Sequence, residues 1–293
     1  FIIAIAVSSN LQGAATLIGD TTAIMLGSAL DLSFLEFFWY QGKPSIFFAV
    51  ELGAVLSAFI LMFIFRKENG KIEGFNEKTK VTDYVPTVLL VSALVLLILA
   101  SLIPNKPDIT NGLICCALLV VGITYKTVKE RNLKSIVPVL KGIDFETIFI
   151  LLGLFLMIGG ISEQGVIDKV ATFFAEIGGN NIFLLYTVIV WASVLISAFI
   201  DNIPYVATMI PVIAGISSSL GIDPTPLYFG LLSGATLGGN CTPIGASANI
   251  TGIGILRRNG YEVKNKDFFR IGIPFTLAAI VPAYIYIWLV YGI

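Results

Sequence analysis

Two aspartates, Asp20 and Asp201, lie inside otherwise apolar stretches and are the residues of this chain best placed for chemistry. From Ile177 to Leu256 only Asp201 and Asp223 carry a charge. A carboxylate at membrane depth costs at least about 2.5 to 3.5 kcal/mol on insertion scales, so it needs a function. Both Asp20 and Asp201 are suited to binding Na⁺ or carrying a proton. The alternative for Asp201 is structural, as the N-terminal cap of the next helix.

Two similar blocks interrupt the apolar pattern near these aspartates. Residues 11–19 read Leu-Gln-Gly-Ala-Ala-Thr-Leu-Ile-Gly, and residues 237–245 read Leu-Gly-Gly-Asn-Cys-Thr-Pro-Ile-Gly. Five of the nine positions are identical at a constant offset of 226 residues. Each block lies within an apolar segment that a further apolar segment follows, so the blocks predict an internal repeat.

A break in a membrane helix exposes N–H groups of one half and C=O groups of the other, which can hold anions and cations. Glycines let a ligand approach this backbone, and hydroxyl and amide groups add neutral ligands. The alternative is that small residues only allow helices to pack closely. The predicted ion- and substrate-binding residues are Asn10, Thr16, Gly19, Asp20, Asp201, Asn202, Gly239, Asn240, Thr242, Gly245 and Asn249, with a Na⁺ position near Asp201, Asn202 and Thr242.

The composition is that of a membrane protein. Hydrophobic residues make up 56% of the 293 residues and charged residues 13%, with a mean hydropathy of +0.91, whereas soluble domains are roughly a quarter charged. The net charge of −1 leaves no basic surface for nucleic acid. The chain has no histidine, which excludes Ser-His and His-zinc chemistry. We expect no cofactor other than a coupling ion, Na⁺ or H⁺.

The apolar segments predict an all-α integral membrane protein, because a span needs about 20 apolar residues. Uninterrupted spans are expected at 46–65, 85–103, 109–125, 145–161, 182–200 and 268–291. Three apolar segments are interrupted by polar or proline residues, namely 1–35, 203–220 and 224–256. The three cysteines are too few and too badly placed for a disulfide framework. Cys241 is read as a packing residue, with thiol capture of arsenite as the alternative.

Basic residues set the expected orientation by the positive-inside rule. They gather in three loops that we assign to the cytoplasm, around Arg66–Lys80, Lys126–Lys141 and Arg257–Arg270. Between the outer loop ending near Asn181 and Arg257, the charges require an odd number of crossings. Either 182–200, 203–220 and 224–256 all span, or 182–220 is a re-entrant hairpin. The hairpin is favoured, because irregular charged backbone at Asp201 is tolerated at mid-depth in a protein cavity.

In this topology the two similar blocks cross the membrane in opposite directions, which is typical of inverted-repeat secondary transporters. Residues 1–65 are then the end of the first repeat, with a broken helix at 1–35 and a span at 46–65. Residues 66–142 hold cytoplasmic loops and two connecting spans. Residues 143–293 form the second repeat, with a span, the hairpin 182–220, the broken helix 224–256 and the final span. Because Phe1 reads as mid-helix, the counterpart of the hairpin is expected ahead of it.

The motifs Ser197–Pro204 and Gly238–Asn249 resemble those of the ion transporter superfamily. The likeness is closest to the branch with arsenite-efflux permeases, NhaD-type sodium/proton antiporters, the melanosomal P protein and citrate-transporter-like permeases. Ser8–Asn10 and Thr16–Asp20 are similar to its first-half motif, although Asp20-Thr21-Thr22-Ala23 replaces the usual Asp-Pro-Pro-Asn. The resemblance implies two inverted halves with hairpins and broken helices, a homodimer, and an elevator-like motion.

The resulting hypothesis is a secondary active transporter of a small ion in the plasma membrane, coupled to Na⁺ or H⁺. The substrate stays open between arsenite or another oxyanion, Na⁺ exchanged for H⁺, and a di- or tricarboxylate. An intramembrane aspartyl protease is disfavoured, because the Gly-x-Gly-Asp motif would need glycine where Leu17 stands. An ion channel is the third class. We expect a small inorganic ion or carboxylate and the lipid bilayer as partners.

Overall fold

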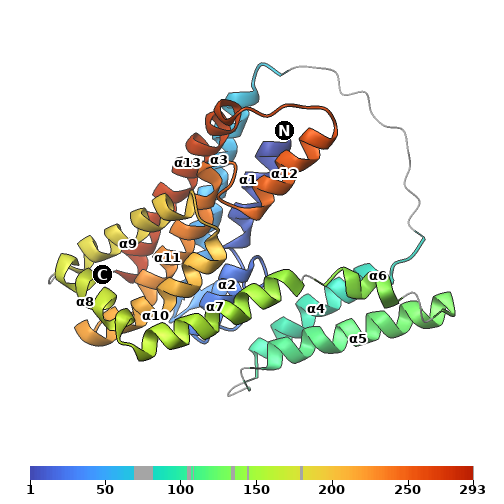
Figure 1. Ribbon diagram of the computed structural model, residues 1–293, viewed down its shortest axis with the longest axis horizontal. Coiled ribbons are helices and arrows are strands. Elements are labelled where there is room, and N and C mark those ends of the chain that lie inside the picture. Colours follow the sequence, from blue (N-terminus) through green and yellow to red (C-terminus); the bar gives the residue numbers. More distant parts are fainter. Residues whose placement is uncertain are drawn as a thin grey trace. The chain divides into compact units, whose positions relative to one another are not determined.

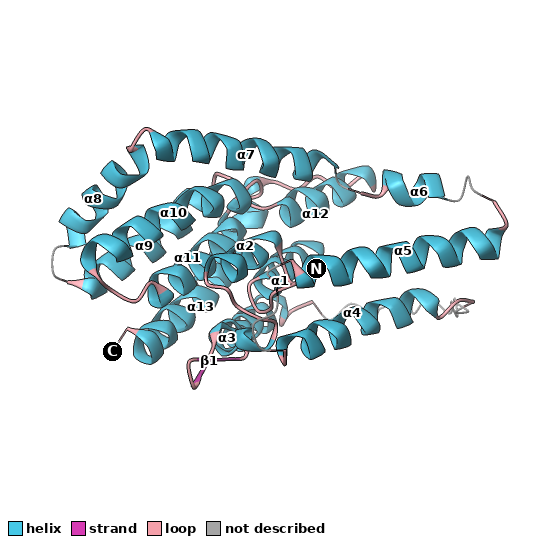
Figure 2. Cartoon of the chain, turned by 90° about the horizontal axis from the view of Figure 1, so that it is seen from below, coloured by secondary structure: helices cyan, strands magenta, loops and turns pink. Residues whose placement is uncertain are grey.

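The computed structural model describes residues 1–68, 82–103, 107, 109–132, 136–143, 145–178 and 181–292. Nearly all of the described chain is helical (Figure 2), which confirms the all-α fold class. The chain divides into two compact units. Unit 1 comprises Phe1–Leu32, Glu36–Glu68 and Gly153–Ile293, and unit 2 comprises Ser33–Leu35 and Asn69–Leu152. Lys71, Lys78, Lys80 and Lys134, which belong to the predicted cytoplasmic loops, lie outside the described residues, as do Lys106 and Asp144.

Several helices are long and apolar enough to cross a membrane. In the described part of the chain four helices meet the requirements of length, hydropathy and low charge together, namely α3 (Ile46–Phe65), α5 (Thr110–Glu130), α10 (Asn202–Leu220) and α13 (Asn265–Tyr291). Shorter apolar helices are α1 (Ile2–Gly13), α4 (Val85–Ser101) and α9 (Ile182–Ser197). Many of their large apolar side chains are exposed, as lipid-facing side chains must be. The protein is therefore a multi-pass membrane protein.

Both interrupted segments that carry the repeated blocks are broken helices. The first consists of α1 and α2 (Thr21–Ala29), and the second of α11 (Thr225–Gly238) and α12 (Ser247–Arg258). The 3₁₀ turn Gly239–Cys241 extends the end of α11. The first loop lies between Gly13 and Gly19, and the second contains Pro243, which cannot continue a helix, between Gly239 and Gly245. The breaks thus fall at the two sequence blocks.

Helix α11 forms the core of unit 1, since every one of its residues is buried. It packs on α9 through three glycines spaced four residues apart. A Cβ at Gly230 would meet the Tyr186 ring at 2.7 Å, and Cβ atoms at Gly234 and Gly238 would meet the carbonyl oxygens of Val190 and Val194 at 2.6 Å each. Because residue numbers rise together on both helices, α9 and α11 run parallel. These glycines allow close helix packing. For Gly238 this agrees with the packing role that the sequence analysis gave as the alternative to ligand binding.

The chain from α9 to α10 folds back on itself at residues 198–201. The Ser193 and Tyr205 hydroxyls hydrogen-bond across the two arms at 3.0 Å. Since α9 runs parallel to α11, its start lies level with the start of α11 and its end lies level with the helix break. The turn therefore reaches the break. This is the geometry that a re-entrant hairpin requires, and its depth in the membrane stays a prediction.

Helices α3 and α13 pack tightly against each other in antiparallel order, as Figure 1 shows. A Cβ at Gly53 would meet the Ala279 carbonyl oxygen at 2.4 Å. A two-stranded hairpin, β1 (Trp39–Tyr40) and β2 (Lys43–Pro44), precedes α3. Its Lys43 Nζ donates to the Val290 carbonyl at 2.6 Å. At the opposite end, the Phe1 and Phe65 rings stack at 4.7 Å, so α1 begins where α3 ends.

Helix α10 has a further packing partner in unit 1. Helix α8 (Val166–Gly178) packs against it, and a Cβ at Gly215 would meet the Ala171 Cβ at 3.1 Å. Helix α7 (Phe145–Glu163) begins in unit 2 and ends in unit 1.

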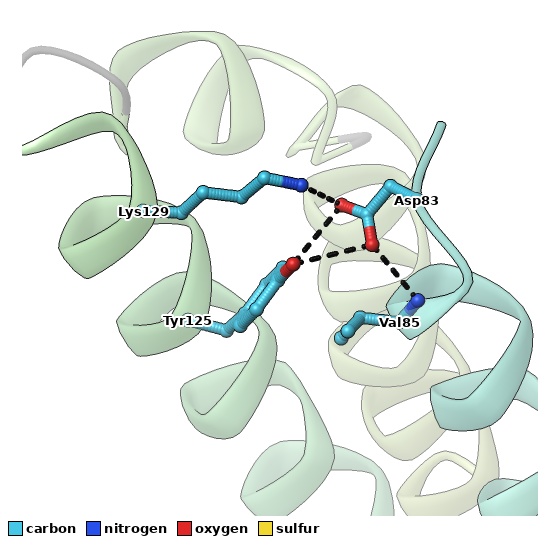
Figure 3. Close-up of polar contacts among 4 residues, drawn as sticks. All are labelled: Asp83, Val85, Tyr125 and Lys129. Atoms are coloured by element: carbon cyan, nitrogen blue, oxygen red, sulfur yellow. Dashed lines mark hydrogen bonds and ion pairs between the residues drawn. The ribbon is translucent and has the colours of Figure 1, made fainter.

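Unit 2 holds α4, α5 and α6 (Ile136–Lys141). The start of α4 meets the end of α5 in a half-buried polar cluster (Figure 3). Lys129 Nζ donates to Asp83 Oδ2 at 2.7 Å, and the Tyr125 hydroxyl donates to both Asp83 oxygens at 3.2 and 3.3 Å. Asp83 Oδ1 also accepts the Val85 N–H at 3.0 Å, which caps the start of α4. None of the residues of α5 is buried.

Candidate functional site

The two broken helices cross in unit 1 in opposite directions (Figure 1). A Cβ at Gly252 would lie 3.3 Å from the Ala6 Cβ, which places the start of α1 beside α12. Further along, Asn10 contacts Asn240, and Thr22 contacts Thr236. Residue numbers thus rise along one broken helix while they fall along the other. This antiparallel relation is the one that an inverted repeat requires of its two copies.

Paired glycines let each break close on itself. A Cβ at Gly19 would lie 2.5 Å from the Gly13 carbonyl oxygen, and a Cβ at Gly239 would lie 2.7 Å from the Gly245 carbonyl oxygen. The two pairs occupy equivalent positions at the 226-residue offset. No side chain other than hydrogen fits such approaches. The predicted site glycines Gly19, Gly239 and Gly245 therefore shape the loops by backbone contact.

Two asparagines brace the crossing of α1 and α11. Asn10 Nδ2 donates to the Thr236 carbonyl at 2.6 Å and to Asn240 Oδ1 at 3.1 Å. Asn240 Nδ2 in turn donates to the Val7 carbonyl at 3.0 Å. Both side chains are buried, where an unpaired amide would cost about 1–3 kcal/mol. Each broken helix thus satisfies polar groups of the other.

The carboxylate of Asp20 joins the first break to the hairpin turn. As N-cap of α2, its Oδ1 accepts the Thr21 N–H at 2.7 Å. Its Oδ2 accepts the Thr22 hydroxyl and Asn202 Nδ2, each at 3.1 Å. Thr22 also hydrogen-bonds the Thr236 hydroxyl at 3.1 Å. Asp20 is half-buried, so one charged group organises three donors from two distant segments.

The neighbouring Asp201 joins the same turn to the second break. It caps α10 through the Ile203 N–H at 3.1 Å, as the structural alternative predicts, and its Oδ2 accepts the Ser247 hydroxyl at 3.3 Å. The Thr242 hydroxyl donates to the Ala198 carbonyl. Asp201 therefore caps its own helix, α10, and also contacts Ser247 at the start of α12.

Asn249 lies fully buried behind the second break. Its Nδ2 donates to the carbonyl oxygens of Gly239 at 2.9 Å and Thr242 at 3.0 Å, which closes the loop between α11 and α12. Its Oδ1 is buried without a hydrogen-bond partner. A buried carbonyl oxygen of this kind is suited to receive a donor or a cation.

The structure brings ten of the predicted residues into one polar cluster, which we call the crossing cluster: Asn10, Gly19, Asp20, Asp201, Asn202, Gly239, Asn240, Thr242, Gly245 and Asn249. Thr16 lies in the first loop, where its carbonyl accepts the Gly19 N–H at 2.9 Å. The sequence analysis missed Thr22 and Thr236. Thr236 stands at the repeat position of Asn10, so extending the repeat backward would have found it.

The described cavities do not contain the cluster. A groove of about 480 Å³ runs between α1 and α3. Its lining is Phe1, Ala4, Ile5, Ser8, Ser9, Gln12 and Leu61. The crossing cluster combines buried groups, among them Asn10, Asn240 and Asn249, with the half-buried carboxylates of Asp20 and Asp201.

The chemistry of the cluster is that of oxygen ligands. Its helices and loops, α1 through α2 and α9 through α12 as far as Leu256, carry no lysine or arginine. In the part of the chain that the structure describes, no three His, Cys, Asp or Glu side chains gather as for a transition metal. Hydroxyl, amide, carboxylate and backbone oxygens suit hard cations such as Na⁺, and the carboxylates suit protons.

The fold and cluster thus define a multi-pass α-helical membrane protein with two crossing broken helices. A family model described as "Citrate transporter" matches residues 1–234 and 118–293. The chain belongs to this citrate transporter family.

Relatives extend the comparison. An uncharacterized transporter of Mycobacterium tuberculosis, Rv2684, is 33% identical over 295 residues, which cover 99% of this chain and 67% of the relative. An uncharacterized transporter of Synechocystis, slr0753, is 25% identical over 97% of this chain and 66% of its own. The human P protein is 35% identical over 46% of this chain and 17% of its own. The chain spans about two thirds of the length of the two bacterial relatives, and both of these relatives are named as transporters.

Proposed function

We propose that the protein is a secondary active transporter of a small ion in the plasma membrane, with Na⁺ or H⁺ as the coupling ion at Asp20 and Asp201. The observation that carries this proposal is the crossing cluster. Asp20 of the first broken helix contacts Asn202 of the hairpin turn, and Asp201 of the same turn contacts Ser247 of the second broken helix; no lysine or arginine neutralises the two carboxylates within those elements. Carboxylate oxygens without a cationic side chain beside them are suited to bind a hard cation such as Na⁺.

The transported ion is the second part of the proposal. An anion such as a carboxylate or arsenite is supported by the second break, where Ala246 gives α12 no side-chain cap, so that the helix N-terminus is free for an anion. The first break differs, because Asp20 already caps α2. Exchange of Na⁺ for H⁺ is supported by the two carboxylates alone. The proposed assembly is a homodimer, as the family resemblance implies.

The test is flux in proteoliposomes made with the full-length transporter. Na⁺, citrate and arsenite are presented in turn at several pH values, with counterflow and a pH-sensitive dye as readouts. Proton movement evoked by Na⁺ alone would establish antiport, whereas flux of one anion would assign that anion as substrate. Flux that neither saturates nor depends on a coupling gradient would identify a channel and overturn the proposal.

The role of the carboxylates has its own test in the same vesicles. Asp201→Asn and Asp20→Asn each remove one charge and keep the side-chain shape, so we expect coupled transport to fall at least about a hundredfold while expression persists. Asp223→Asn is the matched control, because Asp223 accepts hydrogen bonds from the Thr225 N–H and hydroxyl at the start of α11, away from the crossing cluster. Unchanged transport in both site variants would contradict the assigned role.

A further inference from the structure

The hairpin turn is fastened to both broken helices by two consecutive residues. Asn202 donates to Asp20 at the first break, and Asp201 accepts from Ser247 at the second. Asp20 and Ala246 are equivalent at the 226-residue offset, as are Thr21 and Ser247. The N-terminal ends of α2 and α12, the second halves of the two broken helices, therefore both contact the turn. At α2 the carboxylate, Asp20, belongs to the broken helix, whereas at α12 the carboxylate, Asp201, belongs to the turn.

The Asp20 contact depends on charge. An ionised carboxylate only accepts hydrogen bonds, so Thr22 and Asn202 must both donate to Oδ2. Because the Thr22 hydroxyl has one proton, the Thr236 hydroxyl must then donate to Thr22. Protonation at Oδ2 makes that oxygen a donor and reduces its capacity to accept the Asn202 amide. Hydrogen bonds to an ionised group are also about twice as strong as neutral ones.

We propose that Asp20 and Asn202 form a charge-dependent latch, in which ionised Asp20 holds the hairpin turn closed on the first break and neutralisation of Asp20 releases it. This inference deepens the proposed function and rests on it, since it names the contact through which a coupling proton would act on the turn. Thr22 and Thr236 are positioning residues of the latch, because they orient the carboxylate and need not touch the transported ion.

Few other titratable groups face this carboxylate. The adjoining elements α1, α2, α10 and α11 contain no lysine, arginine or glutamate. Their titratable side chains are Asp201, which accepts from Ser247, Tyr205, which bonds Ser193, and Tyr228, which donates to the Ile210 carbonyl. Asp201 is therefore the one other carboxylate among these groups, and its contacts are separate from those of Asp20.

The test follows the turn directly by ¹⁹F NMR, without substrate or gradient. The full-length transporter is stripped of Cys115, Cys116 and Cys241, and a trifluoromethyl label is attached at Phe199→Cys, a site that is 69% exposed in the turn. The latch predicts two label signals whose populations change with pH in the parent. In Asp20→Asn the ratio of the released to the closed signal at high pH should rise about tenfold over the parent. The pH-dependent change of this ratio that depends on Asp20 should be absent.

Three variants make the test decisive. Asn202→Ala keeps the carboxylate and removes its partner, so the label should show the released signal at every pH. Asp201→Asn should retain the Asp20 titration, and Asp223→Asn should match the parent. The proposal is overturned if Asp20→Asn or Asn202→Ala titrates as the parent does. The readout is conformational, so a titrating latch in a protein without flux would contradict only the proposed function.

Discussion

At the scale of the residue, the breaks depend on glycines that allow backbone to touch backbone. Gly245 is the most constrained of them, because a Cβ there would meet three carbonyl oxygens, those of Gly239 at 2.6 Å, Ala198 at 2.8 Å and Ser197 at 2.9 Å. None of these atoms lies at the end of a flexible side chain, so relief requires backbone movement. The same contact brings the hairpin turn against the second break.

We expect Gly245→Ala to destabilise the protein by about 1–3 kcal/mol, as overpacking of a rigid site does. The matched control is Gly254→Ala in α12, where a Cβ meets nothing within 4 Å. Alanine in that helix interior should instead stabilise by roughly 0.5–1 kcal/mol. Thermal unfolding in detergent measures both changes. Equal melting temperatures for the two variants would refute the close backbone approach.

At the scale of the element, an ion pair between Asp83 and Lys129 connects two helices of unit 2. Asp83 holds the start of α4 against the end of α5, and its pKa lies below the ordinary 3.8. The hydrogen bond from Lys129 is the largest cause, followed by the bond from the Val85 N–H. A depressed pKa means that the folded form favours the ionised carboxylate. The stabilisation is complete above 3.8 and is lost as the pH falls through the lower folded value.

The expected outcome is a titration of the Asp83 carboxyl below 3.8, followed by NMR of its side-chain carbon. Lys129→Met should raise this pKa, because it removes the strongest donor. Lys126→Met on the same helix should leave it unchanged, because the donors to Asp83 are Lys129, Tyr125 and the Val85 N–H. If both variants shift the titration equally, the general positive charge of the loop is responsible and the specific contact is not.

At the scale of the whole molecule, unit 1 contains both broken helices and the hairpin, and α4 to α6 fall in unit 2. The Asn10 and Asn240 brace, together with the Ala6 and Gly252 contact, ties the two broken helices to each other. Elements that share buried hydrogen bonds move together, because separating them would leave amides unpaired. The transport motion should therefore carry both breaks as one body.

A disulfide between α1 and α12 tests this expectation. Ala6→Cys and Gly252→Cys would place the two Cβ atoms about 3.3 Å apart, close to the usual spacing of a disulfide. In a background without the native cysteines, the oxidised double variant should transport at the rate of its reduced form. A rate that falls on oxidation and returns on reduction would show that the two breaks separate during the cycle.

The positions of several helices could be predicted from the sequence, because the length of an apolar segment is a local property of the chain. The predicted spans at 46–65, 182–200 and 268–291 differ from α3, α9 and α13 by at most a few residues at either end. Apolar length determines such helices, since every backbone group must be bonded internally in lipid. The positions of both breaks were likewise predicted from glycine, proline and polar residues. The domain boundaries and the membrane depth of the hairpin stay predictions.

The sequence by itself determined the membrane class, the helix breaks and the two aspartates, because hydropathy, helix-breaking residues and buried charge are local properties of the chain. The tertiary structure alone decided which groups meet. It placed Asn202 on Asp20 and Thr236 on Thr22, pairs 182 and 214 residues apart, and it showed that the glycines face backbone. Such contacts depend on how distant helices cross, and one sequence without the packed helices does not contain that geometry.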